Sequence, residues 1–102
     1  MANRMVYFDR AEVILRVPAK KKVLTYNLLS SDFSRIQFEK CKERKFGIIP
    51  VESEKISLAA SKLPGVVSYS KGKNKKFYEE YKKEFAEYAK TYRITFSDNT
   101  KD

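Results

Sequence analysis

The apolar residues in the first two thirds of the chain recur with the period of β-strands. Residues 13–15 form an apolar run that ends at Pro18, and residues 23–29 alternate with a period of two. The basic stretch between them, residues 19–22, predicts a hairpin loop. The pattern thus begins with two antiparallel strands, each with one buried face.

The alternation resumes after a polar turn at residues 30–32 and predicts a third strand over residues 33–39. We expect the charge run at residues 40–45 to form a solvated turn. A fourth strand is predicted at residues 46–51, bent or ended by its glycine and its proline, because proline cannot donate to a central ladder.

Two more short strands complete the β-rich part of the chain. The first covers residues 54–60, with Ile56 and Leu58 facing inward and Ser57 outward. Turn-forming residues at positions 63–65 separate it from the second, at residues 66–70. Several short strands at this spacing predict a sandwich or a small barrel.

The period changes to that of a helix after residue 73. Asn74 is a suitable N-cap, and a helix of about 17 residues is expected to follow it. Its apolar face can dock on the sheet and cap the barrel. That face consists of residues at three- and four-residue steps: Phe77, Tyr81, Phe85, Tyr88, Ala89 and Tyr92.

The last residues predict a short extended segment and then a tail. Residues 93–96 read as extended, and we expect residues 97–102 to form a flexible C-terminal tail. Residues 1–96 would then form a single α+β domain, a bent antiparallel β-barrel or sandwich of six to seven short strands capped by one amphipathic helix.

Composition limits the chemistry available to this domain. The 102 residues include no histidine and one cysteine, so Cys–His and Ser–His pairs and an ordinary zinc site cannot be assembled. We therefore expect no enzyme activity, no catalytic residue, no metal and no cofactor. Cations beside Cys41 could lower its pKa, although a strand or hairpin cysteine among solvated lysines is the simpler interpretation. A single cysteine and the absence of a signal-peptide core favour a cytoplasmic protein.

The net charge is +9, and residues 18–76 account for it. Three lysine-rich clusters, residues 20–22, 40–45 and 71–76, are each expected in a loop, where they could form a basic surface for phosphate, nucleic acid or an acidic protein. The lysines of the last cluster begin the predicted helix, where the positive end of the helix dipole makes cations unfavourable. A bound anion would offset this electrostatic repulsion. Lysine-rich loops could equally serve solubility alone. The candidate anion-binding residues are Lys20, Lys21, Lys22, Lys71, Lys73, Lys75 and Lys76.

The order of six or seven short strands followed by one long helix resembles that of pleckstrin-homology-like (PH-like) domains. The similarity to small bacterial members of this superfold covers about residues 11–92. It is carried by DFSRIQF at residues 32–38, FG at 46–47, EKISL at 54–58 and KFYEEY at 76–81. This superfold hosts lipid, peptide and protein binders alike, so the resemblance by itself names no ligand. Together with the missing catalytic chemistry, the resemblance implies a non-catalytic binding module.

Phosphoinositide-binding members of this superfold carry basic residues around the first hairpin, a region that holds Arg16 and residues 20–22 in this chain. The arginine of their pattern has no counterpart, because Leu24 stands two residues after Lys22. We therefore expect a protein partner or self-association into a homo-oligomer. The alternative is that the loop lysines bind anionic lipid head groups or nucleic acid.

Overall fold

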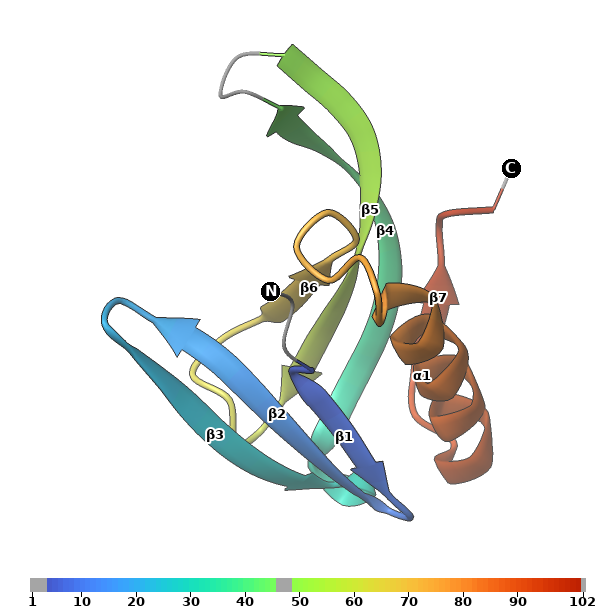
Figure 1. Cartoon of the computed structure of the whole chain (residues 1–102). Helices are drawn as coiled ribbons and strands as arrows, with labels where there is room; N and C mark the ends of the chain where they lie inside the picture. Colours follow the sequence, from blue (N-terminus) through green and yellow to red (C-terminus); the bar gives the residue numbers. More distant parts are fainter. Residues whose placement is uncertain (1–3, 46–48, 102) are drawn as a thin grey trace.

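The computed structural model describes residues 4–45 and 49–101, which form seven β-strands in two sheets and one α-helix (Figure 1). The first sheet, in the order β1-β2-β3, contains β1 (Val6–Asp9), β2 (Glu12–Ala19) and β3 (Lys22–Leu29). The second, in the order β6-β5-β4-β7, contains β4 (Phe33–Lys45), β5 (Ile49–Ala60), β6 (Val67–Ser70) and β7 (Phe96–Asp98). A 3-10 turn, η1 (Ser30–Asp32), joins the sheets, and α1 (Tyr78–Tyr92) follows β6. The α+β class and the single C-terminal helix are confirmed.

The two sheets do not close into a barrel. Across the residues that the structure describes, strands pair only within each sheet, so the predicted barrel closure is wrong. The predicted hairpin of β2 and β3 is confirmed, with Glu12 opposite Leu29 and Ala19 opposite Lys22. Strand β7 departs from the expected antiparallel arrangement, because it pairs in parallel with β4 over three residues, from Ile36 opposite Phe96 onward.

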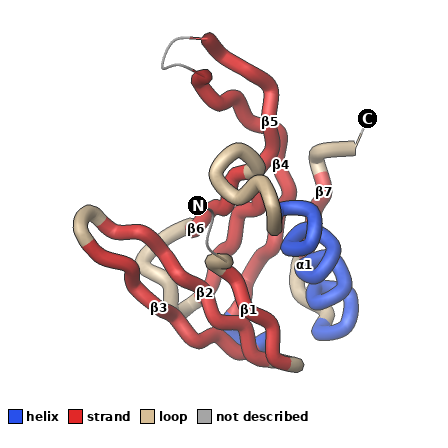
Figure 2. Tube along the Cα trace, viewed as in Figure 1, coloured by secondary structure: helices blue, strands red, loops and turns tan. Residues whose placement is uncertain are grey.

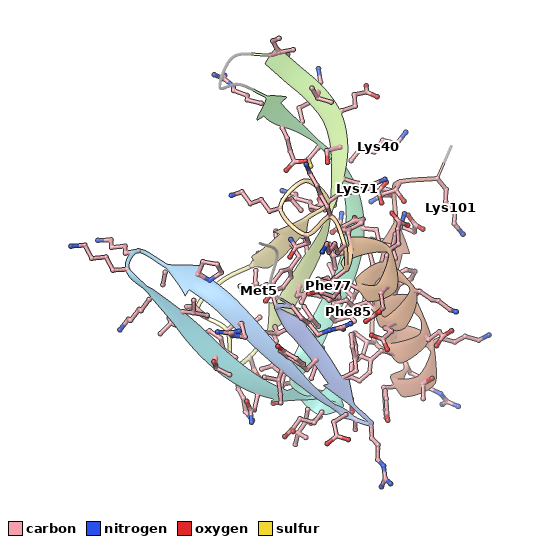
Figure 3. The ribbon with its side chains drawn as sticks, viewed as in Figure 1. Met5, Lys40, Lys71, Phe77, Phe85 and Lys101 are labelled. Atoms are coloured by element: carbon pink, nitrogen blue, oxygen red, sulfur yellow. The ribbon has the colours of Figure 1, made fainter. Side chains whose placement is uncertain are left out.

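The core lies between the inner faces of the two sheets and the aromatic face of α1. Phe85 of the helix is fully buried and stands edge to face with Phe8 of β1, their ring centroids 4.8 Å apart. Tyr88 makes a similar contact with Phe33 of β4 at 5.7 Å. The predicted helical stripe is therefore confirmed in part as the surface that joins α1 to both sheets (Figure 3). Four of its members are buried, but Tyr92 is 37% exposed, and the fully buried Tyr78 was not predicted to belong to it. Such edge-to-face pairs add about 0.5–1.5 kcal/mol each to the stabilisation from burial.

Three tyrosine hydroxyls, which we call the bridging tyrosines, fasten β6 and α1 to the N-terminal part of the chain. Each one bonds a backbone group between residues 5 and 16. The hydroxyl of Tyr81 accepts the N–H of Met5 at 2.7 Å, that of Tyr69 donates to the carbonyl of Arg16 at 2.9 Å, and that of Tyr88 donates to the carbonyl of Ala11.

The largest departure from expectation is the β4–β5 arm, which we define as residues 39–45 of β4 and 49–54 of β5. The charge run at residues 40–45 is not a turn, because β4 continues through it and pairs with β5 as far as Lys45 opposite Ile49. The fourth and fifth expected strands are one strand, β5, in which Pro50 lies opposite Arg44. Phe46, Gly47 and Ile48 lie outside the described residues. The arm projects beyond β6 and β7 (Figure 2).

Smaller corrections concern the ends of elements. Pro18 does not end its strand, since β2 continues to Ala19 and Pro18 pairs with Val23. Asn74 is not the N-cap, because α1 begins four residues later and its cap, Phe77, makes no side-chain bond. Strand β1 was not expected, and the pairing of β7 continues into the segment expected to be a tail.

Candidate functional site

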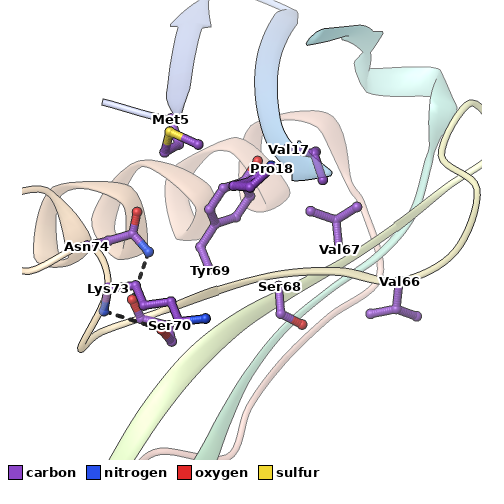
Figure 4. A pocket seen from close by; sticks show the side chains of 10 residues that line it. All are labelled: Met5, Val17, Pro18, Val66, Val67, Ser68, Tyr69, Ser70, Lys73 and Asn74. Carbon is purple, nitrogen blue, oxygen red and sulfur yellow. Dashed lines mark hydrogen bonds between the residues drawn. The ribbon is translucent and has the colours of Figure 1, made fainter. Parts of the chain in front are cut away.

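A cleft of about 600 Å³ opens between the end of β2 and strand β6 (Figure 4). Val17 and Pro18 of β2 form one wall, and Val67 and Tyr69 of β6 form the facing wall. The bond from the Tyr69 hydroxyl to the Arg16 carbonyl holds the two walls in place beneath the opening. We call this space the β2–β6 cleft; its lining is completed by Met5, Val66, Ser68, Ser70, Lys73 and Asn74.

The edge of β6 that faces away from β5 presents backbone groups without a partner strand. The N–H of Lys71 donates to Glu54 of β5 at 2.9 Å, and in an antiparallel ladder alternate residues point the same way. Tyr69 therefore directs its N–H and C=O toward β5, whereas Ser68 and Ser70 direct theirs outward. Within the described residues, only the Ser70 carbonyl on this edge has a partner, the amide of Asn74 at 2.8 Å.

The segment from residue 71 to 77, which we call the lysine loop, closes one end of the cleft. Asn74 is buried, and its side-chain amide ties the loop to the Ser70 carbonyl. The N–H of Lys73 donates to the hydroxyl of Ser70 at 3.3 Å, which keeps Lys73 at the mouth of the cleft. A buried asparagine thus positions a lysine whose own side chain is exposed.

The candidate lysines divide between two places. Lys20, Lys21 and Lys22 are exposed at the turn between β2 and β3, where Lys20 has a left-handed φ of 45°. Lys71, Lys73, Lys75 and Lys76 are exposed on the lysine loop. Figure 1 shows these two segments well apart, so they do not form a single patch.

The lysine-rich cluster at residues 40–45, in the arm, does meet the lysine loop. A carboxylate oxygen of Glu43, in the arm, accepts the N–H of Gly72 at 3.2 Å. Hydrogen bonds from Ser53 and Ser70, the Gly72 N–H and the charge of Lys73 lower the pKa of Glu43, while its partial burial opposes them. A shallow pocket of about 480 Å³ lies at this junction. Acidic and basic side chains mix there, so it is not a simple anion site.

Cys41 lies in the arm as a half-buried strand residue. Burial raises the pKa of its thiol, and the carboxylates of Glu43 and Glu39 raise it further, while Lys55 acts in the opposite direction. The flanking lysines therefore do not activate the thiol. The expectation that they could lower its pKa is wrong, and the simpler interpretation of a strand cysteine fits this environment.

Sequence reasoning missed the β2–β6 cleft altogether. Val66 and Val67 were assigned to a strand, and their proximity to the end of β2 follows only from the way the two sheets pack. No local signal marked it, because the 69% exposure of Val66, which is unusual for a valine, appears only in the structure.

Two classes of site are not found in the part of the chain that the structure describes. No three His, Cys, Asp or Glu side chains there are grouped to hold a metal ion. No helix within residues 4–45 and 49–101 is both long and apolar enough to cross a membrane.

Comparison with protein-family models, with curated proteins and with solved structures gives no match to this chain. Its function is therefore inferred from its own geometry and charge.

Proposed function

We propose that this chain is a non-catalytic interaction module that binds a segment of a partner protein. The observation that carries the proposal is the β2–β6 cleft, which combines an apolar lining with the outward edge of β6. Open strand edges are common sites for protein association, because an added strand satisfies their backbone groups.

The order of elements supports a PH-like origin for the module. Six strands precede a single amphipathic helix, as the resemblance in the sequence implies. Two features depart from that pattern, namely the unclosed sheets and the parallel strand β7 after the helix. Superfolds of this kind host many functions, so the site argument does not depend on the assignment.

Selection from a random peptide display library against the immobilised chain tests the proposal. We expect related sequences to be enriched, and the peptides made from them to bind saturably near 150 mM salt. Val66→Asp, in the exposed wall of the cleft, should reduce the number of enriched peptides, whereas Leu29→Asp, at a 48% exposed position of β3 away from the cleft, should not. Failure to enrich any related sequences would contradict the proposal.

Self-association is the second form of the same proposal, since the partner strand could come from another copy of the chain. Light scattering after size exclusion at rising concentration would then show a mass above 12.0 kDa. A constant monomer mass at the highest concentration would contradict self-association and leave a different protein as the partner.

The alternative function is the binding of anionic lipid head groups or nucleic acid through the exposed lysines. The observation in its favour is the exposure of all seven candidate lysines. Binding to anionic liposomes and short oligonucleotides should then fall steeply with salt, because each phosphate contact releases counterions. Reversal of Lys20, Lys21 and Lys22 to Glu should abolish it. Binding that is absent, or insensitive to salt, would eliminate this alternative.

A further inference from the structure

We infer that the partner segment is an extended, acidic peptide with aliphatic side chains at alternate positions, and that it adds to the outer edge of β6 as a further strand. The inference rests on the proposed function and names the chemistry of the partner.

The backbone of β6 fixes the conformation of the peptide. Ser68 presents both its N–H and its C=O outward, and Ser70 presents its N–H, since its C=O is bonded to Asn74. Three backbone groups over three residues match the hydrogen-bonding repeat of an extended chain, whereas the backbone groups along the side of a helix are bonded within the helix. Strand β6 has four residues, so it can pair with a peptide of about four to six residues.

The two sides of such a strand would meet different surroundings. Alternate side chains of an extended peptide point to opposite faces. On the cleft side they meet Val17 and Pro18 of β2, with Val66 at the rim. On the other side they meet the hydroxyls of Ser68 and Ser70. The cleft side therefore favours aliphatic side chains, and the outer side favours polar ones.

Charge selects acidic residues for the outer side. Lys73 lies at the mouth of the cleft beside Ser70, and the rest of the lysine loop continues from it. The charge of the whole chain is +9, so an acidic segment is also attracted at long range, while a basic one is repelled. Among the described residues, the lining of the cleft holds no acidic side chain; on the outer side, the Glu43 carboxylate accepts a hydrogen bond from Ser70 and is opposed by the charge of Lys73.

A defined probe tests the inference directly. We would measure the fluorescence anisotropy of a labelled peptide of alternating glutamate and valine, with a lysine–valine peptide as the charge control. A third peptide, methylated on alternate backbone nitrogens, has the same side chains but cannot form a ladder. We expect saturable binding of the first peptide alone near 150 mM salt.

Variants of the chain then locate the site. Ser68→Pro removes an outward N–H and leaves the bonds of β6 to β5 in place, because proline is tolerated where the N–H faces away from the sheet. Val66→Asp alters the exposed rim of the cleft, and Lys73→Glu reverses the charge at its mouth. Each should weaken the affinity for the probe about tenfold, whereas the matched changes Leu29→Asp, at the other end of the β2–β3 hairpin, and Lys101→Glu should alter that affinity less than twofold.

The outcomes separate this inference from the function on which it rests. Equal binding of the methylated peptide, or binding of the probe to all three cleft variants as to the unaltered chain, would overturn strand addition at β6. If library peptides bind while the acidic probe does not, the inference fails and the proposed function stands. If no peptide binds in either experiment, both fail.

Discussion

Removal of the Tyr81 hydroxyl should destabilise the fold more than removal of any other tyrosine hydroxyl that bonds the N-terminal strands. The side chain of Tyr81 is fully buried, and its hydroxyl accepts the N–H of Met5 at 2.7 Å. Tyr81→Phe keeps the ring in the core and leaves that N–H without its acceptor. Leaving a buried N–H without an acceptor lowers the free energy of unfolding. We expect a loss of about 1–2 kcal/mol, in the lower part of the range for such groups, because Met5 is only half-buried.

The other bridging tyrosines provide an internal scale for this cost. Tyr69→Phe and Tyr88→Phe each leave a carbonyl, not an N–H, without one partner. A carbonyl has two lone pairs and tolerates the loss better, so each change should cost about 0.5–1.5 kcal/mol. Tyr7→Phe is the matched control, because the side chain of Tyr7 is 41% exposed and the change should stay within about 0.5 kcal/mol.

Urea unfolding followed by circular dichroism measures these free energies. For a domain of this size, 1 kcal/mol corresponds to a shift of about 4–8 °C in Tm, so thermal scans provide a second readout. We expect the order Tyr81→Phe, then Tyr69→Phe and Tyr88→Phe, then Tyr7→Phe, with an unchanged urea m-value. A Tyr81→Phe variant as stable as Tyr7→Phe would refute the claim that this hydroxyl fastens α1 to the N-terminal strand.

Three further predictions follow from local environments. Burial raises the pKa of Tyr88 to about 12, so the folded chain keeps the proton of this hydroxyl to a higher pH than the unfolded chain does. The free energy of unfolding, measured by urea unfolding at each pH, should therefore fall as the pH rises from about 10 to 12. The fall should be smaller in Tyr88→Phe. Gly72→Ala places a Cβ 2.5 Å from a carboxylate oxygen of Glu43, so the Glu43 side chain must rotate away and lose its hydrogen bond from the N–H of residue 72. Amide hydrogen exchange in the arm should then accelerate, and an unchanged exchange rate would contradict this contact. Because the pKa of Cys41 is raised, iodoacetamide should alkylate it more slowly at pH 7.5 than it alkylates an unstructured cysteine peptide, and equal rates would contradict the environment described.

The parts of the fold that were predicted are those in which local periodicity and burial agree. The alternation of Leu24, Tyr26 and Leu28 gave β3 correctly, and the three- and four-residue steps from Tyr81 to Tyr88 gave the buried face of α1. In both cases one face of the element is covered, so the sequence pattern reports the tertiary environment directly.

The β4–β5 arm was missed because it has no core to impose a pattern. Its lysines alternate with Cys41 and Glu43, and its contacts with the lysine loop and α1 are made by the polar side chains of Glu43 and Glu54, so charge density suggested a turn. Strand β7 was predicted too early in the chain, since the segment expected to be extended, residues 93–96, overlaps it only at Phe96. Its parallel pairing was missed because three residues that pair with β4 across a long sequence separation leave no local signal of that pairing.

The candidate site was only partly predictable. The exposure of the seven candidate lysines followed from their charge, and their division between two places did not. The β2–β6 cleft depends on how the end of β2 meets β6, two segments about fifty residues apart that do not hydrogen-bond as strands. Geometry of that kind is set by the packing of the whole core and not by any stretch of sequence.

The parallel pairing of β7 with β4 has a consequence for the order of folding. Ile36 and Phe96 are direct neighbours although 60 positions separate them, so closing this pair costs more chain entropy than closing any hairpin in the molecule. Each of the other ladders joins strands that are consecutive in the chain. We expect the two sheets and their hairpins to form first, α1 to dock next, and β7 to complete the edge of β4 last. Until that step, the edge of β4 beside Phe38 stays open, and a folding intermediate would expose there the backbone groups that the native chain covers.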